Sequence, residues 1–154
     1  KQVKFNENIL VMFSGIAVYP IVISRNSKTK EIYAIEFNPI ANKYALENLK
    51  LNKINNIKLF KGDVKKILPK IKLKFDRIIM PAPKNADQYL NLIENKTKKN
   101  TIIHFYDFSQ EKDFPEGSIN KIKNHFKKIK ILNAVKCGAY SPYVYRVCID
   151  FQVL

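Results

Sequence analysis

The chain has 154 residues, 46% of them hydrophobic, which suits one globular domain whose core is layered between helices and a sheet. Its net charge of +15, from 28 Lys and Arg against 13 Asp and Glu, favours an anionic partner such as RNA or DNA, although a codon bias toward Lys would supply part of it. No apolar stretch approaches the roughly 20 residues of a membrane-spanning helix, and Cys137 and Cys148 form neither a disulfide framework nor a CxxC metal pair, so we expect a cytoplasmic protein that does not contact a membrane.

Short β-branched or aromatic runs alternate with longer helical stretches, a pattern typical of an α/β domain with a largely parallel sheet. We predict strands at Ile9–Phe13, Ile32–Glu36, Ile57–Lys61, Phe75–Met80, Thr101–Asp107, Ile129–Lys136 and Val144–Phe151, and helices at Tyr19–Arg25, Ile40–Asn52, Asn85–Lys96 and Pro115–Lys127. The last two strands have no helix between them, so they should form an antiparallel hairpin, unlike the end of an NAD-binding Rossmann sheet. No repeat or linker divides residues 1–154, so we expect one domain.

The first predicted strand ends in a turn of small residues around Gly15, which lets the backbone approach a ligand beyond the carboxyl ends of the strands. A dinucleotide fingerprint needs three glycines, but Ala17 and Pro20 occupy the other two positions, which disfavours NAD. Glu36 ends the next strand, about twenty residues later, where a carboxylate can accept hydrogen bonds from both hydroxyls of an adenosine ribose. The alternative is a solvated acid at a strand end, which the spacing to Gly15 makes less favourable.

Two neighbouring positions also suit a nucleoside. Phe37 follows Glu36 and can pack on an adenine face. Asp63 follows the third strand, where it can bond an adenine amino group, cap the short helix that begins at Val64, or do both.

Beyond the fourth strand we expect residues that position an acceptor, meaning the molecule that receives a transferred group. Pro81 and Pro83 stiffen the loop that ends at Lys84; such a loop can hold an acceptor against a donor, or it can simply stop the strand. In the final hairpin turn, Tyr140, Ser141 and Pro142 can line the acceptor pocket, although a hairpin turn alone explains these residue types nearly as well.

Neither histidine indicates a metal site. His104 lies inside the fifth strand, where a hydrogen-bonded structural histidine is the simpler interpretation, and His125 lies on a Lys-rich helix face. Since no acids cluster with either residue in the sequence, we expect no bound metal.

Seven segments occur in a characteristic order and spacing: Val11–Ile23, Tyr33–Pro39, Glu47–Lys53, Gly62–Val64, Phe75–Lys84, Ile102–Tyr106 and Ala139–Phe151. Together they resemble the catalytic domain of the archaeal tRNA (guanine-37-N1)-methyltransferase family, which is related to the wyosine enzymes, over nearly the whole chain. The resemblance implies a class I methyltransferase (Rossmann-like) fold with a seven-stranded, mostly parallel sheet. It also implies S-adenosyl-L-methionine (AdoMet) as the cofactor, tRNA as the partner and guanine N1 in the anticodon loop as the methyl acceptor.

The resemblance also suggests which residues form the site. We expect the cofactor to be held by Phe13, Ser14, Gly15, Ile16, Glu36, Phe37, Asn38, Asp63, Val64 and Pro81. We expect the acceptor to be positioned by Pro81, Pro83 and Lys84 and contacted by Tyr19, Tyr140, Ser141 and Pro142. The family's RNA-recognition module, and the residues proposed to accept the guanine N1 proton, precede the matching segment, so we expect them outside this sequence. We expect the protein to be a monomer.

Some positions depart from the family pattern, and they keep alternatives open. Ala17 replaces the second glycine of the first turn, Lys99-Asn100 replaces a glycine pair, and the loop at Pro81 lacks the usual Asn-Leu-Pro. One alternative is an aminocarboxypropyl transferase of wyosine biosynthesis, or a bifunctional methyltransferase of that pathway, although the proline loop resembles the methylating branch better. The other is a non-catalytic RNA-binding module on a methyltransferase fold, which Ala17 mildly favours.

Overall fold

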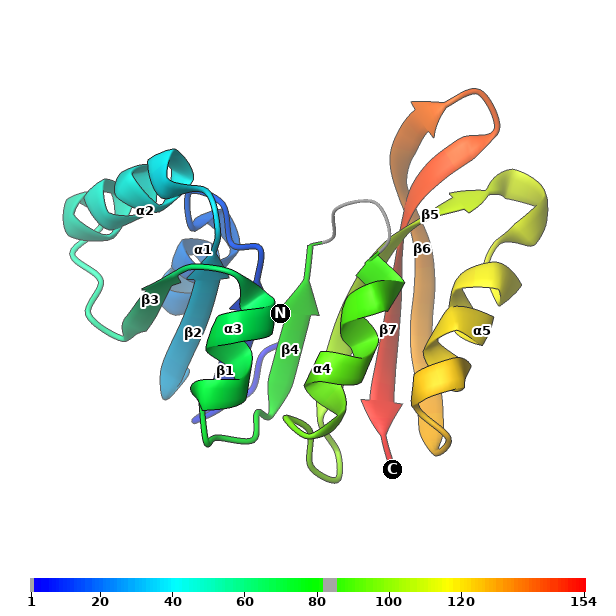
Figure 1. Ribbon diagram of the computed structural model, residues 1–154, viewed down its shortest axis with the longest axis horizontal. Helices are drawn as coiled ribbons and strands as arrows, with labels where there is room; N and C mark the ends of the chain where they lie inside the picture. The colour runs from blue at the N-terminus through cyan, green and yellow to red at the C-terminus, as the bar shows by residue number, and fades with distance from the viewer. Residues whose placement is uncertain (1, 82–85) are drawn as a thin grey trace.

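Seven strands form one sheet in the order β3-β2-β1-β4-β5-β7-β6 (Figure 1). The computed structural model describes residues 2–81 and 86–154. The strands are β1 (Asn8–Met12), β2 (Glu31–Glu36), β3 (Ile57–Lys61), β4 (Arg77–Met80), β5 (Ile102–Gln110), β6 (Ile129–Ser141) and β7 (Val144–Val153). Strands β1 to β5 pair in parallel, whereas β7 lies between β5 and β6 and runs antiparallel to both. This confirms the predicted mostly parallel sheet with an antiparallel C-terminal hairpin.

The direction of strand succession reverses between β1 and β4, and this switch point is where open α/β sheets bind ligands. The hairpin is longer than predicted, since β6 continues to Ser141 rather than ending at Lys136. The sequence predicted a connection between Lys136 and Val144, but register shifts let much of that segment stay paired with β7. Figure 1 shows the hairpin rising past the carboxyl end of β4.

The helices are α1 (Val18–Asn26), α2 (Pro39–Leu51), α3 (Val64–Ile67), α4 (Leu90–Glu94) and α5 (Glu116–His125), with 3-10 turns η1 (Leu68–Lys70), η2 (Ala86–Tyr89) and η3 (Glu111–Asp113). Asn38 caps α2 by accepting hydrogen bonds from the amides of Ile40 and Ala41, and Pro39 occupies the first turn, where no amide hydrogen is needed. The helix predicted over Asn85–Lys96 is instead η2 followed by the short α4, and Asn85 lies outside the described residues.

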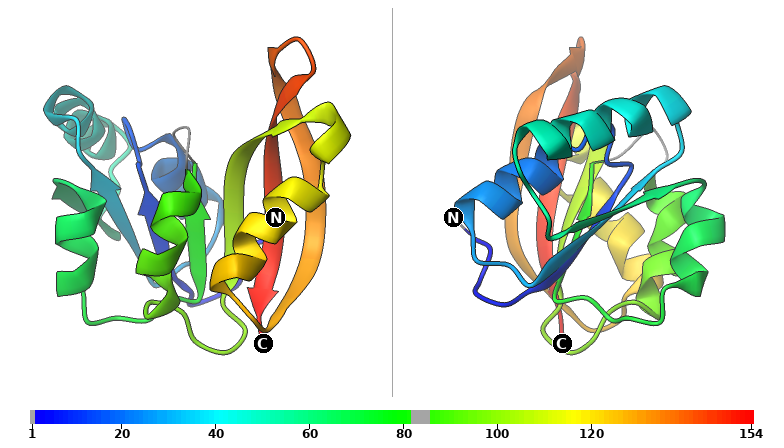
Figure 2. Two further views of the ribbon diagram at one scale, coloured as in Figure 1. Left: turned by 45° about the vertical axis from the view of Figure 1, so that its right-hand side comes forward. Right: turned by 90° about the vertical axis from the view of Figure 1, so that its left-hand side faces the viewer.

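Two layers of helices cover the sheet (Figure 2). The main core fills the space between the sheet and α3, α4 and α5, and it includes Leu68, Phe75, Ile93, Ile122 and Phe151. Smaller clusters lie under α1 and α2 on the opposite face. Over residues 2–81 and 86–154, none of the helices has the length and apolar character needed to cross a membrane.

Candidate functional site

The turn after β1 is built from left-handed backbone. Phe13, Gly15 and Ala17 have φ values of 53°, 56° and 69°, a region in which only glycine is free of strain. The methyl group of Ala17 is fully buried against Ala45 and Leu49, and this packing offsets part of its backbone strain. The turn therefore forms with one glycine where the resemblance implied two.

Glu36 connects this turn to the start of α2. Its Oε2 accepts from the Gly15 amide at 2.7 Å, and its Oε1 accepts from the Asn38 amide at 2.7 Å. The side chain is largely buried, so Glu36 is not a solvated strand-end acid. Because each carboxylate oxygen has a second lone pair, Glu36 can accept further hydrogen bonds from a ligand while it holds both amides.

The hydroxyl of Ser14 is a buried group that lacks a partner. Among residues 2–81 and 86–154, only Ser14 Oγ and Asn42 Nδ2 are buried side-chain polar atoms without a hydrogen bond. An unpaired buried hydroxyl costs free energy, and one in the turn beside Glu36 can be satisfied by a polar ligand. Ile16 and Phe37 are exposed large apolar side chains that directly follow the turn and β2.

The turn after β3 adjoins the same edge of the sheet, because the Gly62 amide donates to the Glu36 carbonyl at 2.9 Å. Asp63 Oδ1 accepts from the Lys65 amide at 2.8 Å and so caps α3, which is one of its two predicted roles. Within residues 2–81 and 86–154, no hydrogen bond to Asp63 Oδ2 accompanies this cap. Val64 is buried in the main core. The structure thus brings Gly15, Glu36 and Asp63 together at three adjacent strand ends.

A cavity of about 290 Å³ opens beside the end of β4. It is lined by Tyr19, Pro81, Tyr106, Asp107, Phe108 and Arg146. The rings of Tyr19 and Tyr106 meet edge to face at 6.1 Å between centroids. Burial, together with a hydrogen bond to Tyr19, raises the pKa of Tyr106 far above its ordinary value, so this phenol stays neutral. Pro83 and Lys84, predicted to frame the acceptor, lie outside the described residues.

Asp107 lines the cavity, but its carboxylate is already occupied by α5. Ser118 Oγ donates to Oδ2 at 2.9 Å, and Lys121 Nζ lies 2.8 Å from the same oxygen and 3.1 Å from Oδ1. Among the described residues that line the cavity, no other side chain carries a carboxylate. The cavity therefore offers aromatic and cationic surfaces to a ligand, and its one described carboxylate is ion-paired with Lys121.

The residues predicted to contact the acceptor are only partly brought to this cavity. Tyr19 lines it, and the Tyr140 ring packs edge to face on Phe108 at 4.8 Å. Ser141 and Pro142 are exposed at the hairpin end and are not among the lining residues. Tyr106, Phe108 and Arg146 also line the cavity and were not predicted from the sequence. The alternation within β5 places Tyr106 and Phe108 on one face, but only the β5–β7 register brings Arg146 opposite Phe108.

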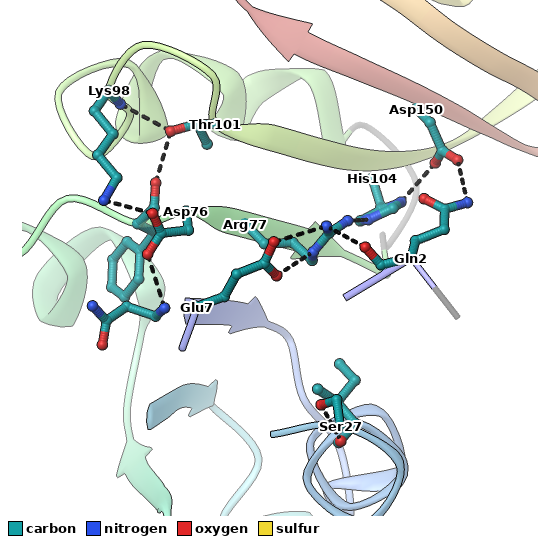
Figure 3. Close-up of polar contacts among 12 residues, drawn as sticks. Gln2, Glu7, Ser27, Asp76, Arg77, Lys98, Thr101, His104 and Asp150 are labelled. Carbon is teal, nitrogen blue, oxygen red and sulfur yellow. Dashed lines mark hydrogen bonds and ion pairs between the residues drawn. The ribbon is translucent and has the colours of Figure 1, made fainter. Parts of the chain in front are cut away.

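A second polar network joins the N-terminal segment to β4, β5 and β7 (Figure 3). Arg77, fully buried, donates to Glu7 Oε2 at 2.8 Å and Oε1 at 3.0 Å, to the Gln2 carbonyl at 2.8 Å and to His104 Nε2 at 2.7 Å. His104 Nδ1 lies 2.7 Å from Asp150 Oδ1, and Gln2 Nε2 donates to Asp150 Oδ2. Every charged group in the network has a partner, so His104 is a hydrogen-bonded structural histidine, as the sequence predicted.

His104, Cys148 and Asp150 place three metal-ligand atoms within 4.8 Å of one another. The cluster could not be recognised in the sequence, because its members come from β5 and β7. The Arg77 guanidinium donates to Nε2, which puts the ring proton on Nδ1, directed at Asp150. Burial and the neighbouring Asp150 raise the pKa of Cys148, so its thiol stays protonated. A cation would have to displace both protons and disrupt the Arg77 contact, so we assign the cluster to stabilising the fold.

Comparison with known proteins identifies relatives over nearly the whole chain. Residues 1–133 match the TRM5/TYW2 methyltransferase domain family. The chain is 34% identical over 158 residues to the tRNA (guanine(37)-N(1))-methyltransferase Trm5b of Pyrococcus abyssi, covering 99% of this chain and 46% of that protein. It is 33% identical over 149 residues to a tRNA(Phe) (4-demethylwyosine(37)-C(7)) aminocarboxypropyltransferase of Methanocaldococcus jannaschii, covering 94% and 59%. The chain thus spans about half the length of these curated relatives.

A solved structure has the same fold. The crystal structure of M. jannaschii TYW2 in complex with AdoMet superposes with a TM-score of 0.88 at 31% identity, covering 99% of this chain and 72% of that one. The sheet order and the Gly15–Glu36 junction therefore lie in a fold that binds AdoMet in that protein.

Proposed function

The chain belongs to the TRM5/TYW2 methyltransferase domain family, and from this membership we propose that it is the AdoMet-binding catalytic domain of an enzyme that methylates guanine N1 at position 37 of tRNA. The observation that carries the proposal is the junction of Gly15, Glu36 and Asn38 at the switch point of the sheet. A charged acceptor there can orient an adenosine ribose, and each such hydrogen bond contributes about 1.5–3 kcal/mol.

The described residues fit AdoMet. Glu36 would accept from the ribose hydroxyls, and Asp63 Oδ2 with the exposed Phe37 ring would meet the adenine. The unpartnered Ser14 hydroxyl would bond the polar methionine end. When bound, AdoMet supplies a methyl group activated on a sulfonium.

The cavity beside Pro81 would receive the acceptor base. An extruded base costs a few kcal/mol to unstack, and the Tyr19, Tyr106 and Phe108 rings offer it replacement contacts. In the transfer, the guanine N1–methyl bond forms as the methyl–sulfur bond breaks, and the N1 proton passes to a base. Because Asp107 is committed to Ser118 and Lys121, we propose that this base lies outside residues 2–81 and 86–154.

Aminocarboxypropyl transfer is the second candidate, because a relative named for that activity is 33% identical to this chain, close to the 34% of a methylating relative. The two reactions use the same cofactor but break different carbon–sulfur bonds, so the placement of the acceptor decides between them. A bifunctional enzyme would methylate both guanine 37 and a wyosine precursor.

Isotope placement separates these reactions. The full-length protein would be incubated with AdoMet labelled either in the methyl group or in the carboxyl group, using a tRNA transcript with guanine 37 and a tRNA carrying 4-demethylwyosine. We expect only the methyl label to enter the transcript, at guanine N1. Carboxyl label in the demethylwyosine tRNA alone would establish aminocarboxypropyl transfer. If the protein binds RNA but neither transfers a label nor binds AdoMet, it is a non-catalytic RNA-binding module.

Calorimetry with AdoMet tests the cofactor site directly. Glu36→Gln should weaken AdoMet binding by roughly ten- to a hundredfold, because a hydrogen bond to a charged acceptor contributes about 1.5–3 kcal/mol. The matched control is Glu47→Gln on the exposed surface of α2, which should bind as the unchanged protein does. Equal affinities of the two variants would refute the assignment of Glu36.

A further inference from the structure

The hairpin of β6 and β7 carries aromatic and cationic side chains that the proposed transfer does not use. The hairpin rises on the same side as the carboxyl end of β4 (Figure 1), and residues 135–143 are all exposed. Phe108 of β5, Tyr140 of β6 and Arg146 of β7 meet on its surface, and we name these three residues the hairpin shelf.

The shelf has the geometry of a stacking site. The Tyr140 ring packs edge to face on Phe108, and the Arg146 guanidinium carbon lies 5.7 Å from the Phe108 centroid. Gly138 pairs with Arg146 across the hairpin and leaves the space beside it open, since a Cβ there would meet no atom within 4 Å. Tyr140 itself is 50% exposed, so much of its side chain remains accessible.

The charges on the hairpin differ between its two faces. Lys136 is bound to Glu111 Oε1 at 2.9 Å and lies over the Tyr145 ring at 4.2 Å. Arg146 points to the face opposite Tyr145, and within the part of the chain that the structure describes it forms no ion pair with a carboxylate. The hairpin shelf therefore combines two aromatic rings with the Arg146 guanidinium, which can bind an anion such as a phosphate.

This surface continues into the proposed acceptor cavity, because Phe108 and Arg146 belong to both. A base that enters the cavity is attached to neighbouring nucleotides, and these must pass over the cavity rim. Proteins bind such unpaired nucleotides with aromatic stacking platforms in positively charged surroundings, and this chain carries a net charge of +15.

We propose that the hairpin shelf stacks an unpaired nucleobase adjacent to the extruded acceptor base in a single-stranded RNA loop. The proposal rests on the proposed function, since it requires an RNA whose acceptor base occupies the cavity. Arg146 then pairs with the flanking phosphate or stacks its plane on that base.

The test uses the full-length protein and a stem-loop RNA that carries guanine at the acceptor position. Stacking contributes about 1–3 kcal/mol per base, so Tyr140→Ala should weaken RNA binding roughly five- to a hundredfold and leave AdoMet affinity unchanged. Tyr143→Ala is the matched control, because Tyr143 is a 77% exposed tyrosine of the same hairpin outside the shelf. It should bind RNA as the unchanged protein does. Arg146→Lys should weaken RNA binding less than Tyr140→Ala, since lysine keeps the positive charge and lacks only the planar guanidinium group.

A second experiment removes the nucleobase next to the acceptor guanine from the RNA. With an abasic site at the flanking nucleotide, Tyr140→Ala and the unchanged protein should bind equally, and 2-aminopurine placed there should lose its binding-induced quenching in Tyr140→Ala alone. If Tyr140→Ala matches Tyr143→Ala while the unchanged protein binds and modifies RNA, the shelf proposal fails and the proposed function stands. If the unchanged protein neither binds nor modifies the RNA, both fail.

Discussion

Replacing Glu7 by Gln leaves the buried guanidinium of Arg77 without its balancing charge. The two side chains are 8% and 0% exposed, and Arg77 Nε lies 2.8 Å from Glu7 Oε2. Removing one member of a buried ion pair costs about 3–5 kcal/mol, because the remaining charge stays desolvated. A domain is stable by only about 5–15 kcal/mol, so we expect Glu7→Gln to lose a large fraction of the free energy of unfolding.

Urea unfolding followed by circular dichroism measures this loss, and a double-mutant cycle tests its cause. Glu7→Gln combined with Arg77→Met should cost less than the sum of the single changes, because the double variant buries no unpaired charge. Glu31→Gln is the control, since it removes an exposed ion pair with Lys58 and should leave the midpoint nearly unchanged. Additive single effects, or a Glu7→Gln loss under about 1 kcal/mol, would refute the reasoning.

Three further outcomes are expected. Ala17→Gly should change the free energy of unfolding by less than about 1 kcal/mol. The relief of left-handed backbone strain, about 1–2 kcal/mol, is offset by the loss of a buried methyl group, about 0.8 kcal/mol, and by the greater backbone entropy of unfolded glycine, about 0.5–1 kcal/mol. In native protein a maleimide should modify the exposed Cys137, and buried Cys148 should react only after denaturation, as peptide mapping would reveal. Burial raises the pKa of Asp150, but hydrogen bonds from His104 and other donors outweigh it and hold the pKa below its ordinary value. Asp150 thus stabilises the fold above the unfolded pKa of about 3.9, and this contribution is lost as pH falls through the folded pKa, so Asp150→Asn should flatten the acid side of the stability profile.

The junction of Gly15 with Glu36 could be predicted because its determinants are local. A strand, a small-residue turn and an acid at the end of the next parallel strand must meet at one sheet edge, so spacing alone placed Gly15 beside Glu36. The cap formed by Asp63 also follows from adjacent residues. Element boundaries differed mainly in β6, where pairing with β7 extended the strand through a segment with turn composition.

The cavity beside β4 and the buried polar network could not be predicted in the same way, because both depend on register between strands far apart in the sequence. The contact of His104 with Asp150 joins residues 46 positions apart, and Phe108 meets Arg146 only through the β5–β7 pairing. A shift of one residue would send Arg146 to the opposite face of the sheet. Nothing in the local sequence of β7 determines which β5 residue it faces, so the cavity wall and the hairpin shelf emerge only in three dimensions.

Residue type alone would have ranked the polar groups wrongly. His104 is the side chain most often associated with catalysis, yet Arg77 and Asp150 use both of its ring nitrogens, and a saturated histidine has no lone pair or proton left for a ligand. Ser14 is an ordinary turn residue by type, but its buried hydroxyl has no partner within residues 2–81 and 86–154. Since folding rarely leaves such a group unpaired, the open hydrogen bond at Ser14 is consistent with a ligand beside Glu36, whereas the saturated His104 offers a ligand nothing.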